Sequence, residues 1–161
     1  LATVHPRSGN YGLVKLTRFT KMDIQVINNL EKKIVLMMNA IQDWDLKWAG
    51  GGYEHFDAWG YTPNGNKCLV EMKFRNKYYS DKLLEKYKYD KLMSMDEDFV
   101  KIYFVSDPRG TYYFWLNDLQ EKNKMPQVKE LYCPDTTLWT KKKVLKKVYL
   151  LTEDLAVRID K

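Results

Sequence analysis

The stretch from Lys67 to Phe74 constrains the fold of this chain more than any other. Its residues, Lys-Cys-Leu-Val-Glu-Met-Lys-Phe, form the apolar run of a buried strand, yet the run carries Glu71 and Lys73. Successive side chains of a strand alternate between the two faces of a sheet, so both charges point the same way. Because charged side chains are seldom buried unless they are paired or put to use, this face is expected to form a site.

A second acid, Asp57, lies within another strand-like run at residues 55–61. The turn signal Pro63-Asn64-Gly65-Asn66 separates this run from the strand that carries Glu71, and it predicts a β-hairpin. Two strands joined by a tight turn bring Asp57 close to Glu71. The pattern of an acid, a hairpin turn and then acid-x-lysine is that of a metal site.

The register of this hairpin decides whether the two acids share a face. A two-residue loop sends Asp57 to the opposite face from Glu71, because it pairs Ala58 with Glu71. A three-residue loop at residues 64–66 pairs Trp59 with Glu71 and keeps both acids on one face. We predict this three-residue loop, or a bulge near Gly60.

Composition limits the classes of protein that fit. The length of 161 residues and 45% hydrophobic content predict one domain, with a core at about 20–105 and C-terminal strands and a basic segment at 110–161. The net charge of +6 and the 12 tyrosines suit a polyanion such as nucleic acid. No run approaches the roughly 18 apolar residues of a membrane span, and the start lacks a secretory pattern. We therefore expect no membrane partner and a cytoplasmic location, which is the host cytoplasm if a phage encodes the protein.

The sequence holds few soft metal ligands. Its two cysteines form no CxxC pair, and it has only two histidines. Any bound metal should therefore be held by oxygen.

Hydrophobic periodicity predicts an amphipathic helix at about 21–43 and a second helix from Asp81 to about Met95, with Ser80 as its N-cap. Strands are expected at residues 44–48, 55–61, 67–74, 99–105, 112–116 and 147–151. Residues 1–19 are read as an arm or an edge strand, and Gly50-Gly51-Gly52 as a turn or bulge. This order predicts an α/β fold with a central mixed β-sheet flanked by helices.

Two carboxylates on adjacent strands make a hard oxygen site suited to Mg²⁺, with Mn²⁺ able to substitute. Asp57 and Glu71 would bind the metal together with the backbone carbonyl of Met72 and waters. Lys73 would stand beside it, where it could orient or deprotonate an attacking water. The arrangement fits in-line hydrolysis of a phosphodiester. In the ordinary alternative, Glu71 and Lys73 are an exposed pair on one face of a sheet.

The run Phe56-Asp57, the hairpin and Glu71-Met72-Lys73 together resemble the PD-(D/E)xK nuclease superfamily, with Phe56 in place of the usual proline. The resemblance implies a restriction-endonuclease-like core, α-β-β-β-α-β, from about Thr20 to Val105. It also implies that Asp57 and Glu71 bind the metal and that Lys73 is catalytic. The Tyr87-Lys88-Tyr89 run is similar to small phage or bacterial members.

Many members of the superfamily add a glutamate from the first helix, which is the role that Glu31 would fill here. Glu31 lies at the margin of the apolar stripe, so a solvated acid is the alternative. Other members add a basic or polar residue from the second helix, for which Lys82, Lys86 and Lys88 all qualify. The resemblance does not separate these three lysines.

The leading hypothesis is a Mg²⁺-dependent DNA endonuclease. Its nucleic-acid contacts are expected directly after the catalytic strand and on the second helix, at Arg75, Lys77, Tyr78, Lys82, Lys86 and Lys88. A second copy of the chain is a further expected partner, because nucleases that cut branched or duplex DNA often work as dimers. The alternatives are an RNA substrate, a noncatalytic nucleic-acid-binding or assembly module that retains the nuclease fold, and a small structural or interaction protein.

Overall fold

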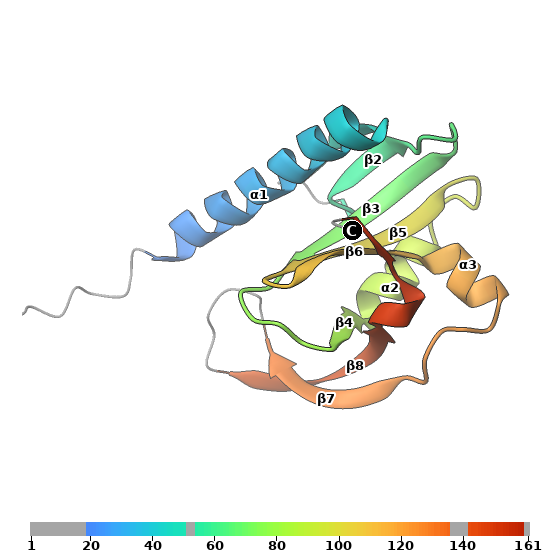
Figure 1. Ribbon diagram of the computed structural model, residues 1–161. Coiled ribbons are helices and arrows are strands. Elements are labelled where there is room, and N and C mark those ends of the chain that lie inside the picture. The colour runs from blue at the N-terminus through green and yellow to red at the C-terminus, as the bar shows by residue number, and fades with distance from the viewer. Residues whose placement is uncertain (1–18, 51–53, 136–141, 160–161) are drawn as a thin grey trace, which may run out of the picture.

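The computed structural model describes residues 19–50, 54–135 and 142–159, which build two β-sheets and the helices packed on them (Figure 1). Within these residues, the larger sheet has the strand order β1-β2-β3-β5-β6-β9 and the smaller one the order β4-β8-β7. The bounds are α1 Phe19–Gln42, β1 Asp45–Trp48, β2 Ala58–Tyr61, β3 Lys67–Phe74, β4 Asp81–Glu85, α2 Lys86–Met93, β5 Val100–Asp107, β6 Gly110–Trp115, α3 Leu116–Glu121, β7 Lys129–Pro134, β8 Lys143–Thr152, the 3₁₀ helix η2 Glu153–Leu155, and β9 Val157–Arg158.

The arm or edge strand expected at residues 1–19 lies outside the described residues, apart from Phe19, which begins α1. Of the glycine turn expected at residues 50–52, the structure describes only Gly50.

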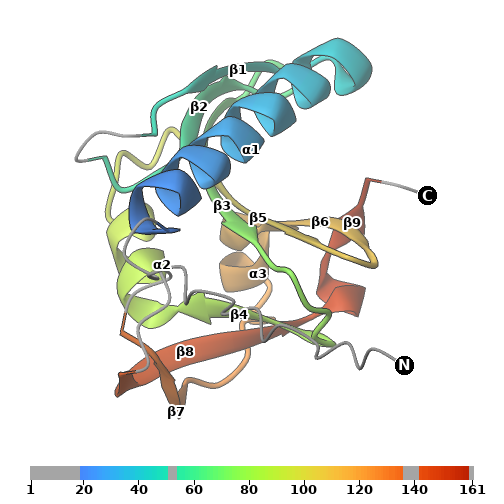
Figure 2. The same cartoon turned by 90° about the vertical axis from the view of Figure 1, so that its left-hand side faces the viewer.

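Helix α1 covers one face of the larger sheet, as both views of the ribbon show (Figures 1 and 2). Its buried side chains Val35 and Met38 pack in one core with Val70, Met72 and Phe104 of the central strands β3 and β5. Apolar residues at helical spacing therefore form the side of α1 that packs against the sheet. The predicted helix at 21–43 is confirmed.

The opposite face of the larger sheet packs against α2, α3 and the smaller sheet (Figure 2). Leu69 and Tyr103 of the larger sheet share this second core with Leu84 of β4, Tyr89 of α2 and Tyr149 of β8. Glu71 and Lys73 alternate with Val70 and Met72, so they point toward this second face. The larger sheet thus separates two cores, and the charges of β3 belong to only one of them.

The hairpin between β2 and β3 has a three-residue turn, but the turn spans residues 63–65 and not 64–66. Ala58 pairs with Val70 and Tyr61 with Lys67, and the amide of Thr62 donates to the carbonyl of Asn66 at 2.9 Å. Trp59 consequently pairs with Leu69, and its predicted pairing with Glu71 is wrong. The pairing moves by two positions, and because side chains alternate with period two, this shift preserves the predicted face of Asp57.

The second helix begins later than predicted. Residues Asp81–Glu85 form strand β4, which pairs antiparallel with β8, and helix α2 starts at Lys86. In β4 the side chains of Lys82 and Leu84 are buried and those between them are partly exposed, which is the period of a strand. The predicted N-cap at Ser80 is therefore wrong.

After α2, the chain returns to the larger sheet as β5, which runs parallel to β3. The strands predicted at 99–105, 112–116 and 147–151 are present as β5, β6 and the longer β8, although Leu116 begins helix α3. Helix α3, strands β7 and β9 and the 3₁₀ helix η2 were not predicted. No described helix is both long enough and apolar enough to span a membrane.

Candidate active site

A pocket of about 190 Å³ opens beside the carboxyl-terminal half of β3. Strand β2 pairs with β3 only as far as Val70, so residues 71–74 continue beyond that ladder. Helix α1 reaches this end of the strand from one face of the sheet and α2 from the other. The pocket is lined by Ile24, Ile27, Asn28, Glu31, Asp57, Met72, Lys73, Phe74 and Lys88.

Asp57 directly precedes β2 and is held by hydrogen bonds to the backbone of β3. Its amide donates to the carbonyl of Val70 at 2.8 Å, and its Oδ2 accepts from the amide of Met72 at 2.6 Å. The carboxylate thus satisfies a backbone donor of β3 at the point where the β2 ladder stops. Burial raises the pKa of Asp57 and outweighs the opposing effect of the Met72 amide.

Glu71 is the more deeply buried of the two acids on the strands, with only 4% of its surface exposed. Its Oε1 forms an ion pair with the ammonium of Lys88, whose side chain is half exposed. Burial, followed by the negative charge of Asp57, raises the pKa of Glu71 to about 7. The charges of Glu71 and Asp57 hold the pKa of Lys88 above its ordinary value in spite of burial.

Glu31 faces inward from α1, so the solvated alternative is wrong. It is 6% exposed, and its Oε2 accepts a 2.8 Å hydrogen bond from Nε1 of Trp48. Burial raises its pKa, and the charge of Asp57 adds to the effect. The carboxylates of Glu31 and Asp57 therefore line one pocket, and Glu71 is joined to it through its ion pair with Lys88.

Lys73 lines the same pocket from β3. Burial, followed by the positive charges of Arg75 and Lys88, lowers its pKa to about 8. A lysine whose pKa lies close to neutral pH can give up and recover a proton at little cost in free energy.

The structure separates the three lysines that the sequence left equivalent. Lys88 lies in the pocket on α2, whereas Lys86 is paired with Asp90 at 2.5 Å along the outside of the same helix. Lys82 belongs to β4 and is 3% exposed.

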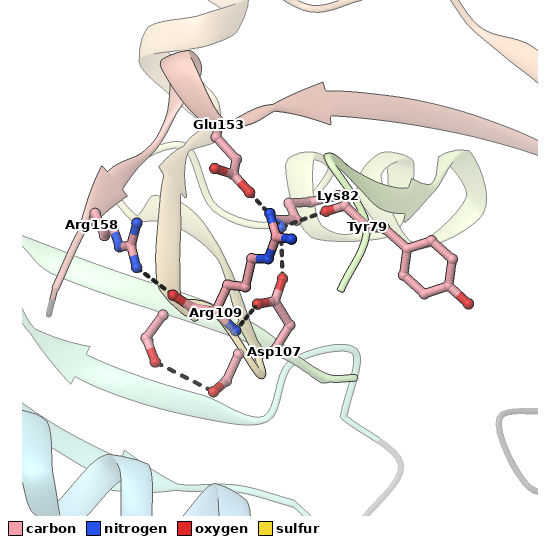
Figure 3. A network of polar contacts seen from close by, with 8 residues as sticks. Tyr79, Lys82, Asp107, Arg109, Glu153 and Arg158 are labelled. Atoms are coloured by element: carbon pink, nitrogen blue, oxygen red, sulfur yellow. Dashed lines mark hydrogen bonds and ion pairs between the residues drawn. The ribbon is translucent and has the colours of Figure 1, made fainter. Parts of the chain in front are cut away.

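Lys82 is buried in a polar network near the start of β4 (Figure 3). Its Nζ donates to Asp107 at 2.6 Å, to Glu153 at 2.9 Å and to the carbonyl of Tyr79 at 2.6 Å. The ammonium of Lys82 is therefore hydrogen-bonded to groups within the fold. The expected contact between Lys82 and nucleic acid is wrong. Lys82 instead joins β4, the end of β5 and η2.

The remaining residues expected to meet nucleic acid follow β3 directly, as predicted. Lys77 is exposed, and Arg75 lies close enough to Lys73 to affect its pKa. The ring of Tyr78 is covered by the guanidinium of Arg109, whose Cζ lies 3.9 Å from the ring centroid. This contact occupies a ring face that was expected to be open to a base.

Sequence reasoning missed the contribution of the first half of α1. Asn28 and Ile24 line the pocket with Glu31, at spacings of three and seven residues. Residues three, four and seven apart share one face of a helix, so this spacing was a signal for them once Glu31 was suspected.

The donor set fits a divalent metal ion of the magnesium type. Across the described ranges, no three carboxylate, imidazole or thiol groups lie close enough together to enclose a metal. Mg²⁺ does not need such a cage, because it usually keeps several waters and takes one or two carboxylates. Asp57 and Glu71 supply those carboxylates, and their raised pKa values mark a place where a cation would stabilise the charged forms.

No protein-family model matches the sequence, and no curated protein matches it. Among solved structures, the chain is similar to Hjc, a Holliday junction resolvase from the archaeal hyperthermophile Archaeoglobus fulgidus. The match has a TM-score of 0.53 and 11% sequence identity, and it covers 81% of this chain and 89% of that chain.

Hjc belongs to the PD-(D/E)xK nuclease superfamily. The likeness shows that the present chain has the restriction-endonuclease-like fold of that superfamily, with a central mixed sheet and few helices. The fold that the resemblance implies and the fold class predicted from the sequence are thereby confirmed.

Proposed function

We propose that this protein is a metal-dependent endonuclease that hydrolyses phosphodiester bonds in DNA. The observation that supports the proposal is that Asp57, Lys73 and Lys88 line one pocket at the end of β3, where Lys88 is paired with the buried Glu71. Two buried carboxylates and two lysines gathered from separate elements are costly to the fold unless they serve a purpose. The restriction-endonuclease-like fold is compatible with this activity.

The two acids on the strands would hold the metal. Asp57, Glu71 and the backbone carbonyl of Met72 are its protein ligands, and Glu31 lies across the pocket where its free oxygen can orient a water. A bound Mg²⁺ supplies polarisation of a phosphate oxygen and a lower pKa for water, and Mn²⁺ is expected to replace it.

Lys73 is the group that handles the proton. Lys73 lines the pocket, so its amine can accept the proton of the attacking water, and its ammonium can orient that water and stabilise charge that develops on the phosphate. Lys88 is the positioning residue for Glu71, because their ion pair holds the carboxylate beside the pocket that Lys88 lines.

DNA is the polymer that the charge distribution favours as substrate. The net charge of +6 attracts a polyanion, and the strand that carries Lys73 leads directly to Arg75 and the exposed Lys77. Cations at these positions can contact phosphates on either side of the bond that is cut. The structural neighbour is a Holliday junction resolvase, so a four-way junction belongs in the panel of DNA forms to be tested.

The test is a cleavage assay on plasmid, duplex, flap, four-way-junction and single-stranded DNA with Mg²⁺, Mn²⁺ or EDTA. Cleavage is expected with either metal and not with EDTA. Asp57→Asn should lower the rate by at least about 100-fold, because a metal ion contributes several kcal/mol to such reactions.

Asp43→Asn is the matched control for this assay. Asp43 is exposed just after α1 and has a φ of 56°, a conformation that asparagine tolerates well. It should cut DNA at the wild-type rate. Cleavage in EDTA, or an Asp57→Asn variant as active as Asp43→Asn, would refute the metal site.

The Lys88–Glu71 ion pair is the observation that favours a second candidate, a noncatalytic nucleic-acid-binding module. A lysine that pairs with the acid can stabilise it without any metal. Under this alternative, the protein binds DNA and cuts none of the forms in the panel with either metal.

A further inference from the structure

A larger pocket, of about 550 Å³, adjoins the candidate active site. Lys73 lines both pockets, so a strand whose scissile phosphate lies beside Lys73 has a neighbouring nucleotide at the mouth of the larger one. Its volume is within the range of pockets that hold small organic ligands, about 300–1,000 Å³.

One wall of this pocket is an apolar face of the smaller sheet. Leu83 of β4 pairs with Leu150 of β8, and residues paired across antiparallel strands share a face. Lys146 lies four residues before Leu150 on β8, so it shares that face. Lys146 pairs with Leu131 of β7, and Cys133 lies two residues after Leu131 on the same face. Leu83, Leu150, Leu131 and Cys133 all line the pocket.

The other wall comes from the larger sheet and the segment that leads into β4. It carries Lys73, Arg75 and Tyr79, and Tyr79 is 54% exposed. The two cations can meet a phosphate, and the tyrosine ring offers a surface on which a base can stack.

The other charges of the lining are largely balanced within the fold. Lys82 is paired with Asp107, and Glu85 with Lys146 at 3.0 Å, while Asp81 adds one acid to the rim. The pocket therefore combines an apolar wall with a cationic and aromatic edge beside Lys73.

We propose that this pocket binds the base of an unpaired nucleotide next to the scissile phosphate, so that the preferred substrate is DNA with a single-stranded branch. The inference rests on the proposed nuclease function, because the phosphate at Lys73 defines which nucleotide reaches the pocket. The apolar wall receives the base, and Arg75 contacts the phosphate of the same nucleotide.

A paired base cannot fill this role without leaving the duplex. A base inside a helix is stacked on both sides, and extracting it costs free energy that an unpaired base does not cost. The pocket thus selects for flaps, gaps and other branch points over continuous duplex, through contact with the base and not through its sequence.

The test measures DNA affinity in EDTA, where no cleavage occurs. Flap DNA of either polarity is compared with the same DNA carrying abasic analogues at its unpaired branch-point nucleotides. Wild-type protein is expected to bind the intact flap about tenfold more tightly than the abasic one, and more tightly than a fully paired duplex.

Leu131→Trp fills the pocket and should bring the ratio of the two affinities to about one. Leu145→Trp is the matched control, because Leu145 lies on the neighbouring strand β8, is 54% exposed, and is not one of the residues that line the pocket. It should retain the wild-type ratio.

A second variant guards against misfolding of Leu131→Trp. Tyr79→Ala removes the stacking surface without adding bulk and should lower the ratio at least about threefold, whereas Tyr61→Ala, at the distant end of β2, should not change it.

Equal wild-type affinity for intact and abasic flaps, or a ratio retained in both Leu131→Trp and Tyr79→Ala, would overturn the inference. These outcomes are separate from failure of the proposed function. If the protein cuts duplex and flap DNA with Mg²⁺ but binds intact and abasic flaps equally, only the base-binding proposal is refuted. If it binds the intact flap more tightly and cuts no DNA, only the nuclease proposal is refuted.

Discussion

Asp57 has a structural contact as well as its proposed role as a metal ligand. Its carboxylate accepts the Met72 amide at 2.6 Å, where β2 no longer runs beside β3. A substitution that removes the acceptor therefore leaves a backbone donor without this partner, which costs about 1–3 kcal/mol. A substitution that keeps an acceptor oxygen should cost less.

We predict that Asp57→Ala lowers the free energy of unfolding by about 1–3 kcal/mol and that Asp57→Asn lowers it by less than about 1 kcal/mol. The asparagine side chain retains a carbonyl oxygen that can accept from Met72. Urea unfolding of the two variants and the wild type without metal measures the difference. Equal stability of the two variants would show that the hydrogen bond contributes nothing, and any loss of cleavage in Asp57→Asn would still reflect chemistry.

At the scale of single residues, sequence reasoning predicted that Asp57, Glu71 and Lys73 share one face of the sheet, because their strands and their turn are close in the sequence. It did not settle Glu31 or Lys88. Whether Glu31 faces inward depends on how α1 is rotated against the sheet, and that rotation is set by the packing of Val35 and Met38 and not by the acid itself.

Among the elements, the pairing of β1 with β2 depends on one glycine. Gly60 has a φ of +152°, and a Cβ added there would lie 1.9 Å from the backbone carbonyl oxygen of Asp45. Leu46, the residue paired with Gly60, is buried beneath α1. The close approach of the two strands therefore requires a residue without a side chain.

We predict that Gly60→Ala destabilises the protein by more than about 2 kcal/mol, because the clash is with backbone that cannot rotate away. Gly65→Ala is the control, since Gly65 also has a positive φ, of +79°, but a Cβ there meets nothing within 4 Å. It should cost only the conformational penalty of about 1–2 kcal/mol. Denaturant unfolding compares the two, and an equal cost would mean that the close approach to Asp45 is not needed.

Helix α2 and strand β4 show where local sequence stops being informative. Residues Asp81–Glu85, Asp-Lys-Leu-Leu-Glu, contain good helix formers and also alternate in burial. What decides between helix and strand is β8, whose Leu150 pairs with Leu83 from a distant part of the sequence. For the same reason β7, with largely exposed side chains, gave no apolar signal of its own.

On the scale of the whole molecule, two sheets are joined by buried polar contacts as well as by the second core. Lys82 of β4 meets Asp107 at the end of β5, and the two side chains are only 2% and 1% exposed. The hydroxyl of Tyr103 on β5 also donates to the carbonyl of Leu83 at 2.7 Å. The network in Figure 3 thus fixes the smaller sheet beside the strand end that carries Lys73.

We predict that Lys82→Met lowers the free energy of unfolding by about 3–5 kcal/mol, because it leaves Asp107 buried without its partner. Lys122→Met is the control; its pair with Asp118 lies on the exposed surface of α3, so it should cost less than about 1 kcal/mol. Thermal or urea unfolding measures both, and a cost below about 1 kcal/mol for Lys82→Met would contradict the proposed tie.

The same network predicts a pH window. The hydrogen bond from Lys82 lowers the pKa of Glu153, so this contribution is present above pH 4.5 and is lost as pH falls through the lowered value. Burial opposes the charge of Lys82, but Asp107 and Glu153 outweigh it and raise its pKa, so the ammonium contributes below 10.5. The stability difference between wild type and Lys82→Met should therefore be level between these values and shrink in acid.

The whole account depends most on Lys73, since it lines both the candidate metal pocket and the larger pocket beside it. Lys67→Met is a matched control for Lys73→Met, because Lys67 is an exposed lysine at the opposite end of the same strand and on the same face. The decisive measurement is the single-turnover rate of DNA cleavage with Mg²⁺ for wild type and both variants.

Lys73→Met is expected to lose at least about 100-fold in rate while it stays folded and keeps most of its affinity for DNA. Lys67→Met is expected to cut as the wild type does. Equal rates for Lys73→Met and the wild type would contradict the proposal that this pocket is the active site of a nuclease.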